Sequence, residues 1–137
     1  MIRRIAPLAL LLVSLPLLLT CGGKSSGTGP LPPDPGKVEL RLATPNTDDG
    51  IMRIVVTGGV VNDAGSGPYE AQFATFGSDS TVILVRGALA SGTVAELTLP
   101  DRNVLASYSA RVAQAASGQT YELQQNLAGY HLSLVKP

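Results

Sequence analysis

Few side chains in this sequence have the types and spacing that chemistry needs. The 137-residue chain has one cysteine, Cys21, and one histidine, His131. Zinc sites draw several ligands from cysteine, histidine and carboxylate side chains, so this pair predicts none, and His131 is expected to face solvent on the last strand. No Gly-x-Ser-x-Gly sequence marks a serine nucleophile. We therefore expect a non-catalytic protein with no cofactor and no metal, and we rank an enzyme third among the functions considered.

Residues 45–50, PNTDDG, contain the best candidate metal ligands. Asn46, Asp48 and Asp49 could offer oxygen atoms to a calcium ion. Their spacing differs from the D-x-D-x-D-G calcium loop, and Asp-Gly after Pro-Asn also suits a hairpin turn. We expect a turn, and calcium coordination is the alternative.

The lone cysteine follows an apolar run. Arg3 and Arg4 precede residues 5–20, IAPLALLLVSLPLLLT, as in an export signal, and a spanning helix would need about 20 apolar residues. Residues 18–21, LLTC, resemble the lipobox of bacterial lipoprotein signal peptides. The resemblance implies lipid transfer to the Cys21 thiol, cleavage before Cys21 and acylation of the new amino terminus. An ordinary secretory signal with an unpaired thiol is the alternative.

The resemblance also implies a location in the cell. In this family an aspartate after the cysteine retains the protein on the inner membrane; Gly22 stands there, which implies the outer membrane, on its periplasmic face or at the cell surface. One acyl chain anchors marginally, at about 0.8 kcal/mol per buried methylene, whereas two or three chains prevent release. The expected partners are the membrane, through the lipid, and an envelope protein. With 10 Lys+Arg against 10 Asp+Glu, no basic field predicts nucleic-acid binding.

The rest of the chain divides into a tether and one domain. Residues 22–36, GGKSSGTGPLPPDPG, are rich in glycine, serine and proline and predict a spacer rather than a proline-rich recognition site. The domain map is therefore a signal peptide over residues 1–20, a lipidated cysteine with a linker over 21–36, and a β domain over 37–137.

The domain predicts an all-β antiparallel sandwich of about seven to eight strands, because short alternating segments are separated by turn residues. The expected strands cover residues 38–42, 51–57, 69–73, 81–86, 93–99, 106–112, 121–124 and 130–134. Residues 101–117 also contain a helical stripe. There we favour a strand, preceded by a short helical turn that Asp101 caps, although the alternation fails at Ala113 and Gln114.

The order of PNTDDG, IMRIVVTGG and VRGALASGTVAELTLPD looks like the cohesin-type sandwiches of bacterial surface proteins, over residues 38–100. It also resembles uncharacterised envelope lipoproteins of similar length. The resemblance implies a sandwich with a binding role, and no residue carries over the binding of dockerin modules.

Strands that are apolar on both faces give the most specific functional hypothesis. Val82 and Leu84 oppose Ile83 and Val85, so both faces need cover, either from a loop over residues 59–68 or 87–92 or from a protein partner. Val82, Leu84 and Phe76 are the candidate partner-binding residues.

A carbohydrate- or small-ligand-binding module is the alternative function, and sugar binding would need exposed aromatic rings. Phe76 is the best exposed candidate. The other aromatic residues are expected to pack in the core, namely Tyr69, Phe73, Tyr108, Tyr121 and Tyr130. The favoured function is a lipid-anchored envelope protein with a non-catalytic interaction module.

Overall fold

The computed structural model describes residues 27, 29–65 and 67–137, and residues Leu31–Pro137 form one compact unit. Cys21 and the predicted signal peptide lie outside the described residues. The elements of the unit are β1 (Gly36–Ala43), β2 (Asp49–Thr57), β3 (Asp63–Gly65), β4 (Glu70–Phe76), β5 (Ser80–Arg86), β6 (Gly92–Leu99), a 3-10 helix η1 (Arg102–Ser107), β7 (Ser109–Ser117) and β8 (His131–Val135).

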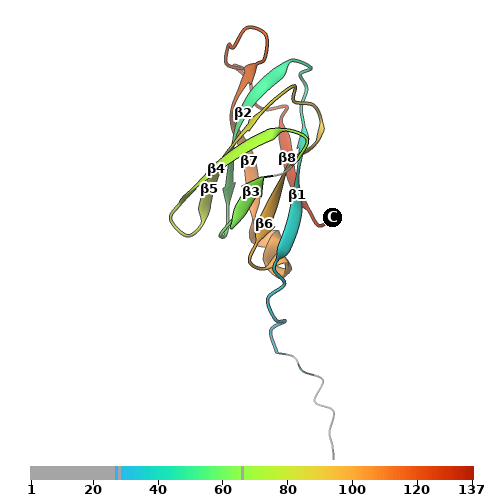
Figure 1. Cartoon of the computed structure of the whole chain (residues 1–137), viewed down its shortest axis with the longest axis vertical. Coiled ribbons are helices and arrows are strands. Elements are labelled where there is room, and N and C mark those ends of the chain that lie inside the picture. Colours follow the sequence, from blue (N-terminus) through green and yellow to red (C-terminus); the bar gives the residue numbers. More distant parts are fainter. Residues whose placement is uncertain (1–26, 28, 66) are drawn as a thin grey trace, which may run out of the picture. The chain divides into compact units, whose positions relative to one another are not determined.

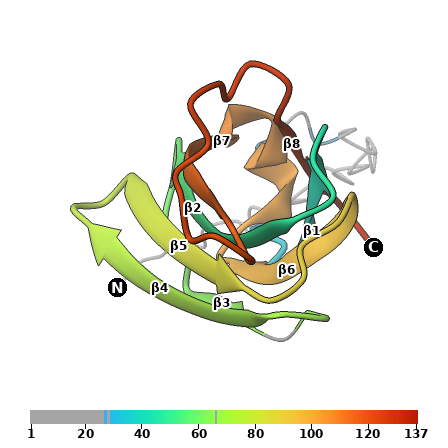
Figure 2. The ribbon, with the colours of Figure 1, turned by 90° about the horizontal axis from the view of Figure 1, so that it is seen from above.

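The strands form two four-stranded antiparallel sheets (Figures 1 and 2). Sheet A has the order β3-β6-β1-β8 and sheet B has the order β4-β5-β2-β7. The predicted all-β sandwich of eight strands is confirmed.

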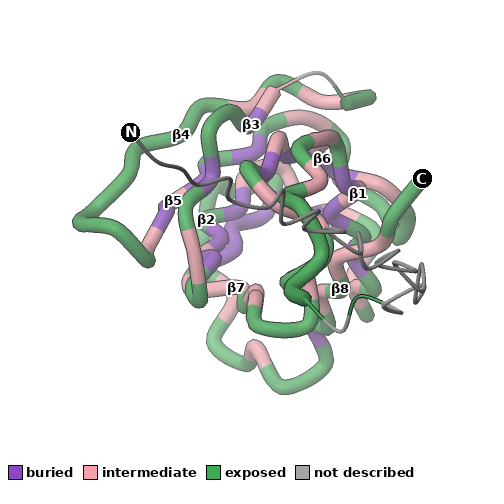
Figure 3. The backbone as a smooth tube through the Cα atoms, turned by 90° about the horizontal axis from the view of Figure 1, so that it is seen from below, coloured by how far each residue is buried: buried purple, intermediate pink, exposed green. Residues whose placement is uncertain are grey.

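The core lies between the sheets because every central strand turns alternate apolar side chains inward. On β1, Val38, Leu40 and Leu42 are buried while the residues between them are not. The central strands β6, β2 and β5 also contribute buried residues, and Figure 3 shows these buried positions on the central strands of both sheets. Their removal from water, at about 25 cal/mol per Å² of apolar surface, is the main force that holds the two sheets together.

The ambiguous segment is a strand preceded by a short helix, as predicted, but the 3-10 helix extends to Ser107 and the strand begins at Ser109 instead of residue 106. Asp101 caps η1, and its Oδ1 accepts a 2.9 Å hydrogen bond from the amide of Asn103. In β7, Val112 pairs with Ile54 and Gln114 pairs with Arg53, so Ala113 is an extra residue. The break in alternation at Ala113 is thus a β-bulge, which restores the inward phase for Ala115.

Two expectations about the strands are wrong. Residues 121–124 form no strand; they lie in the loop between β7 and β8, where Leu123 makes one isolated bridge to Ala116. The expected loop over residues 59–68 contains β3, which pairs with β6 at the edge of sheet A. In the described residues, no helix is long and apolar enough to cross a bilayer.

The segment before β1 contacts η1. The guanidinium Nη2 of Arg102 donates a 2.9 Å hydrogen bond to Oδ1 of Asp34, and the Arg102 amide donates to the Asp34 carbonyl at 2.7 Å. The amide nitrogen of Asp34 in turn donates to Asp101 at 3.0 Å. These contacts attach Asp34 to the start of η1, two residues before β1 begins.

Candidate functional site

The outer face of sheet B is the first candidate site, and it is called the Leu84 face below. Directly paired residues of antiparallel strands share a face, so the register of β4, β5, β2 and β7 gives the side chains that point outward. The apolar members are Ile51, Val55, Ala74, Phe76, Val82 and Leu84, and the charged members are Arg53, Glu70, Arg86 and Arg111.

The three predicted partner-binding residues therefore lie on one face. Val82 pairs with Ala74, while Leu84 pairs with Gln72 and with Arg53 on its two sides. Phe76 stands at the tip of the β4–β5 hairpin, which projects from the sandwich (Figures 1 and 2). Leu84 is 38% exposed and Phe76 is 59% exposed.

Neither predicted loop covers this face. Residues 63–65 form β3 in the other sheet, and Leu89 of the second loop is buried in the core, where its amide donates to the carbonyl of Asp49. A small hollow of about 60 Å³ lies beside Leu84, between the side chains of Ile51, Gln72 and Arg86. The apolar centre thus remains open in the described chain.

Cations surround this apolar centre. Arg86 pairs with Glu70 across β5 and β4. Arg53 and Arg111 make no ion pair or side-chain hydrogen bond within the part of the chain that the structure describes. The unpaired charges that the described residues of the Leu84 face present to a partner are therefore positive.

The outer face of sheet A has a different character. Lys37 pairs with Glu96 at 2.8 Å, and Arg41 pairs with Glu39 at 2.7 Å. The outward residues of the neighbouring edge strand β8 are His131, Ser133 and Val135. The predicted solvent exposure of His131 is confirmed.

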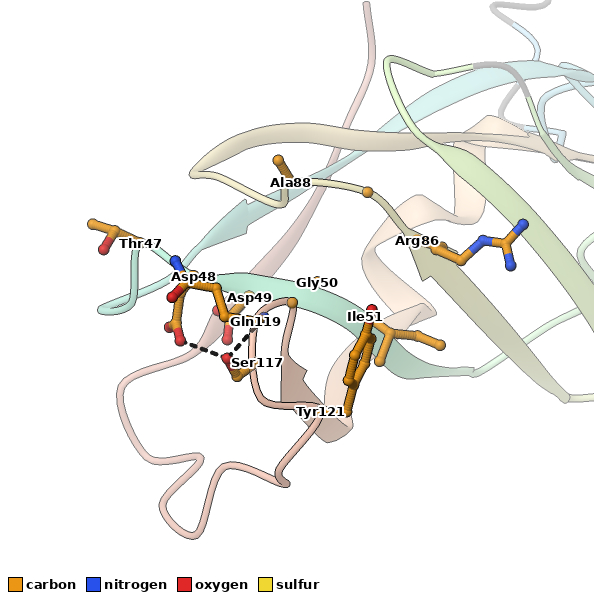
Figure 4. Close-up of a pocket in the computed structure, with 12 residues that line it drawn as sticks. Thr47, Asp48, Asp49, Gly50, Ile51, Arg86, Ala88, Ser117, Gln119 and Tyr121 are labelled. Atoms are coloured by element: carbon orange, nitrogen blue, oxygen red, sulfur yellow. Dashed lines mark hydrogen bonds between the residues drawn. The ribbon is translucent and has the colours of Figure 1, made fainter.

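The second candidate site is a cleft of about 490 Å³, called the Tyr121 cleft below (Figure 4). Three segments line it, namely residues 47–51, residues 86–88, and residues 117–119 with Tyr121. Ile51 and Arg86 line this cleft and also belong to the Leu84 face, so the two sites adjoin.

The acidic pair at the start of β2 is occupied by internal hydrogen bonds. The buried carboxylate of Asp49 accepts from the hydroxyl groups of Tyr130 at 2.7 Å and Thr44 at 2.6 Å, and from Gln124 at 3.3 Å. Burial raises the pKa of Tyr130, and the hydrogen bond that Tyr130 donates to Asp49 adds to this rise. Residues 44–48 turn the chain from β1 to β2, as expected, but these two strands belong to different sheets, so the turn does not close a hairpin.

Asp48 lies closer to the surface, where its Oδ2 accepts a 2.7 Å hydrogen bond from Oγ of Ser117. Among the described residues, no group of three or more histidine, cysteine or acidic side chains could hold a metal ion.

The aromatic side chains divide into two groups. Tyr130 is buried, and Tyr69 and Tyr108 pack against the core, as predicted. Phe73 is 38% exposed because the β4–β5 hairpin projects, and Tyr121 is 80% exposed, so the expectation of core packing is wrong for both. Residues 117–120 (SGQT), just before Tyr121, are rich in turn formers and indicate a loop at this position. The alternating pattern of residues 121–124 instead suggests a strand, which would bury Tyr121.

No protein family model, no curated protein and no solved structure matches this chain.

Proposed function

We propose that this chain is a lipid-anchored envelope protein whose β-sandwich binds another protein, without catalysis, through the Leu84 face. The supporting observation is the contrast between the two outer faces. The outer face of sheet A carries two ion pairs, whereas that of sheet B carries one, between Arg86 and Glu70, and turns Leu84, Val82 and Val55 outward with no loop over them. A contiguous apolar patch with a polar rim is typical of a protein interaction site.

The charges on the Leu84 face define the partner's chemistry. Arg53 and Arg111 stand beside the apolar centre without an ion-pair partner in the described chain. Arginine beside apolar side chains is enriched at the centres of protein interfaces. We therefore propose a partner surface that offers apolar side chains flanked by carboxylates.

The anchor is the second half of the proposal. Acyl chains on Cys21 would hold the domain at a bilayer and confine its search for a membrane-associated partner, which raises the effective concentration of each for the other. Catalysis is left out because the described clusters of polar side chains are internal hydrogen-bond networks that hold turns.

A photo-activated cross-linking residue at position 84, in intact cells, tests the docking surface. We expect one dominant cross-linked protein, and no such product from the same residue at position 133 on the outer face of sheet A. Leu84→Asp should abolish complex formation, and Ser133→Asp is its matched control. Both variants should melt within a few degrees of the parent, because both positions face outward.

Charge reversal tests the proposed partner chemistry. Arg53→Glu combined with Arg111→Glu should weaken the complex at least as much as raised salt does, whereas Lys37→Glu on sheet A should not. Equal cross-linking at positions 84 and 133 would contradict the docking surface. Membrane retention that persists unchanged in Cys21→Ser would contradict the anchor, independently of the docking result.

A further inference from the structure

Tyr121 has an unusual backbone conformation. It is the one non-glycine residue of the described chain with a positive φ, at 60°. This left-handed region is disfavoured for residues with a Cβ, and glycine or asparagine normally occupies it. The side chain gains no burial in return, since it is 80% exposed. When burial of the side chain does not offset the cost of a strained backbone, the strain suggests a functional role for the residue.

Hydrogen bonds fix the turn that holds Tyr121. Its amide donates to the Ser117 carbonyl at 3.0 Å, and the amide of Ser117 donates to the carbonyl of Glu122 at 3.0 Å. Ser117 Oγ donates to Asp48, and the amide of Gly118 donates to the Asp48 carbonyl at 2.6 Å. The ring of Tyr121 is therefore presented by a turn that is tied to the start of β2.

The ring stands at a cleft of ligand size. The Tyr121 cleft measures about 490 Å³, within the range of small-molecule sites. Gly50, Gly87 and Gly118 line it, so part of its wall is bare backbone. In the view of Figure 4 the ring lies across Ile51, while Asp48 and Ser117 lie toward the other end.

The polar groups of the cleft disfavour an anionic ligand. Arg86 is already paired with Glu70, so the cleft offers no free cation to an anionic ligand. The Oδ1 atom of Asp48 and the side-chain amide of Gln119 have no hydrogen-bond partner within the described residues. A wholly apolar ligand would leave these two groups unsatisfied.

We infer that the Tyr121 cleft binds a neutral sugar ring, whose C–H face packs on Tyr121 and whose hydroxyl groups bond to Asp48 and Gln119. A sugar ring combines one apolar face with a rim of hydroxyl donors and acceptors, which matches an exposed aromatic ring flanked by a carboxylate and an amide. This site is separate in function from the protein-docking centre at Val82 and Leu84.

Calorimetric titration of the full chain in detergent micelles tests the inference, with cellotetraose and chitotetraose as neutral probes and a heparin tetrasaccharide as the anionic one. We expect saturable binding of at least one neutral probe and none of the anionic probe. Tyr121→Gly should weaken binding by roughly tenfold or more, and Tyr121→Phe should retain most of it. Tyr121→Gly should melt at or above the parent temperature because glycine accepts a positive φ without strain.

The control variants separate this site from the others. Phe76→Ala removes an exposed ring that lies outside the cleft and should leave sugar affinity unchanged, and so should Leu84→Asp. The inference is overturned if neither neutral probe binds, if the heparin tetrasaccharide binds more tightly, or if Phe76→Ala lowers affinity and Tyr121→Gly does not. Failure here leaves the cross-linking result at position 84 intact, so the two proposals are distinguishable.

Discussion

The phenol of Tyr130 donates a 2.7 Å hydrogen bond to Oδ1 of Asp49, a residue 81 positions earlier in the chain. Asp49 is 1% exposed, and Thr44 and Gln124 donate to the same carboxylate. A buried charge is tolerated only when hydrogen bonds replace its lost hydration. This carboxylate therefore joins the end of β1, the start of β2 and the loop before β8 into one polar network.

Asp49→Ala should lower the free energy of unfolding by about 3 kcal/mol, because it leaves the buried hydroxyl group of Tyr130 and the part-buried donors of Thr44 and Gln124 without this acceptor. Asp49→Asn keeps the size but loses the charge, and its cost should be smaller, at about 1–2 kcal/mol. Urea unfolding measures both values. Asp79→Asn, in the exposed β4–β5 turn, is the control and should stay within about 0.5 kcal/mol of the parent. An Asp49→Ala protein as stable as this control would contradict the network.

The same network predicts a loss of stability in alkali. Burial, and then the hydrogen bond to Asp49, raise the pKa of Tyr130 above that of tyrosine in the unfolded chain, which is about 10. The folded state thus holds this proton more tightly. Its contribution is complete below about pH 10 and is lost as the pH rises through the higher folded pKa.

Melting temperatures between about pH 9 and 12 check this sign. Tyr130→Phe has no proton to lose, so its stability should fall less steeply over this range, although the variant is less stable at neutral pH. Tyr121→Phe, which removes an exposed hydroxyl group, is the matched control. The same slope in Tyr130→Phe and the parent would show that this proton does not contribute.

An acid-dependent contact is expected where the chain enters β1. The hydrogen bond from Arg102 lowers the pKa of Asp34, and the charges of Arg102 and Lys136 add to this effect. The stabilisation is present above the unfolded pKa of about 3.9 and is lost as the pH falls through the lower folded pKa. Asp34→Asn should therefore flatten the decline of melting temperature below about pH 4. Asp79→Asn is again the control, and an unchanged acid limb in Asp34→Asn would contradict the contact.

Local alternation predicts most of the sandwich from the sequence. Val38, Leu40 and Leu42 on β1 show the period of two that a half-buried strand requires, and the structure buries all three. The break at Ala113 is also visible in the sequence, and it proves to be the bulge in β7. The strand alternation and the bulge depend on residues that are close in the sequence, so both can be predicted from the sequence alone.

The candidate sites depend on contacts that are distant in sequence. The solvent exposure of Leu84 depends on the positions of the loops over residues 59–68 and 87–92. The first of these contains β3, a strand of three residues that forms because Asp63–Gly65 pairs with β6. The exposure of Tyr121 depends on a left-handed turn tied to Asp48, 73 positions earlier. Strand alternation alone is enough to name Val82, Leu84 and Phe76 as candidates. No periodic pattern encodes contacts between distant residues, so the sequence does not predict the Tyr121 cleft.

The close approach of Gly50 and Gly118 gives the sharpest steric prediction. A Cβ placed on Gly50 would lie 2.2 Å from the Cα of Gly118, which is backbone and cannot move aside like a flexible side chain. Gly50→Ala must therefore push the turn at residues 117–121 away from β2. We expect a loss of about 2–3 kcal/mol in the free energy of unfolding, measured with urea. Gly65→Ala is the matched control, because its new Cβ would meet no atom closer than 3.9 Å. If both substitutions cost the same, the two backbones are not in contact, and the turn that presents Tyr121 is not held against β2.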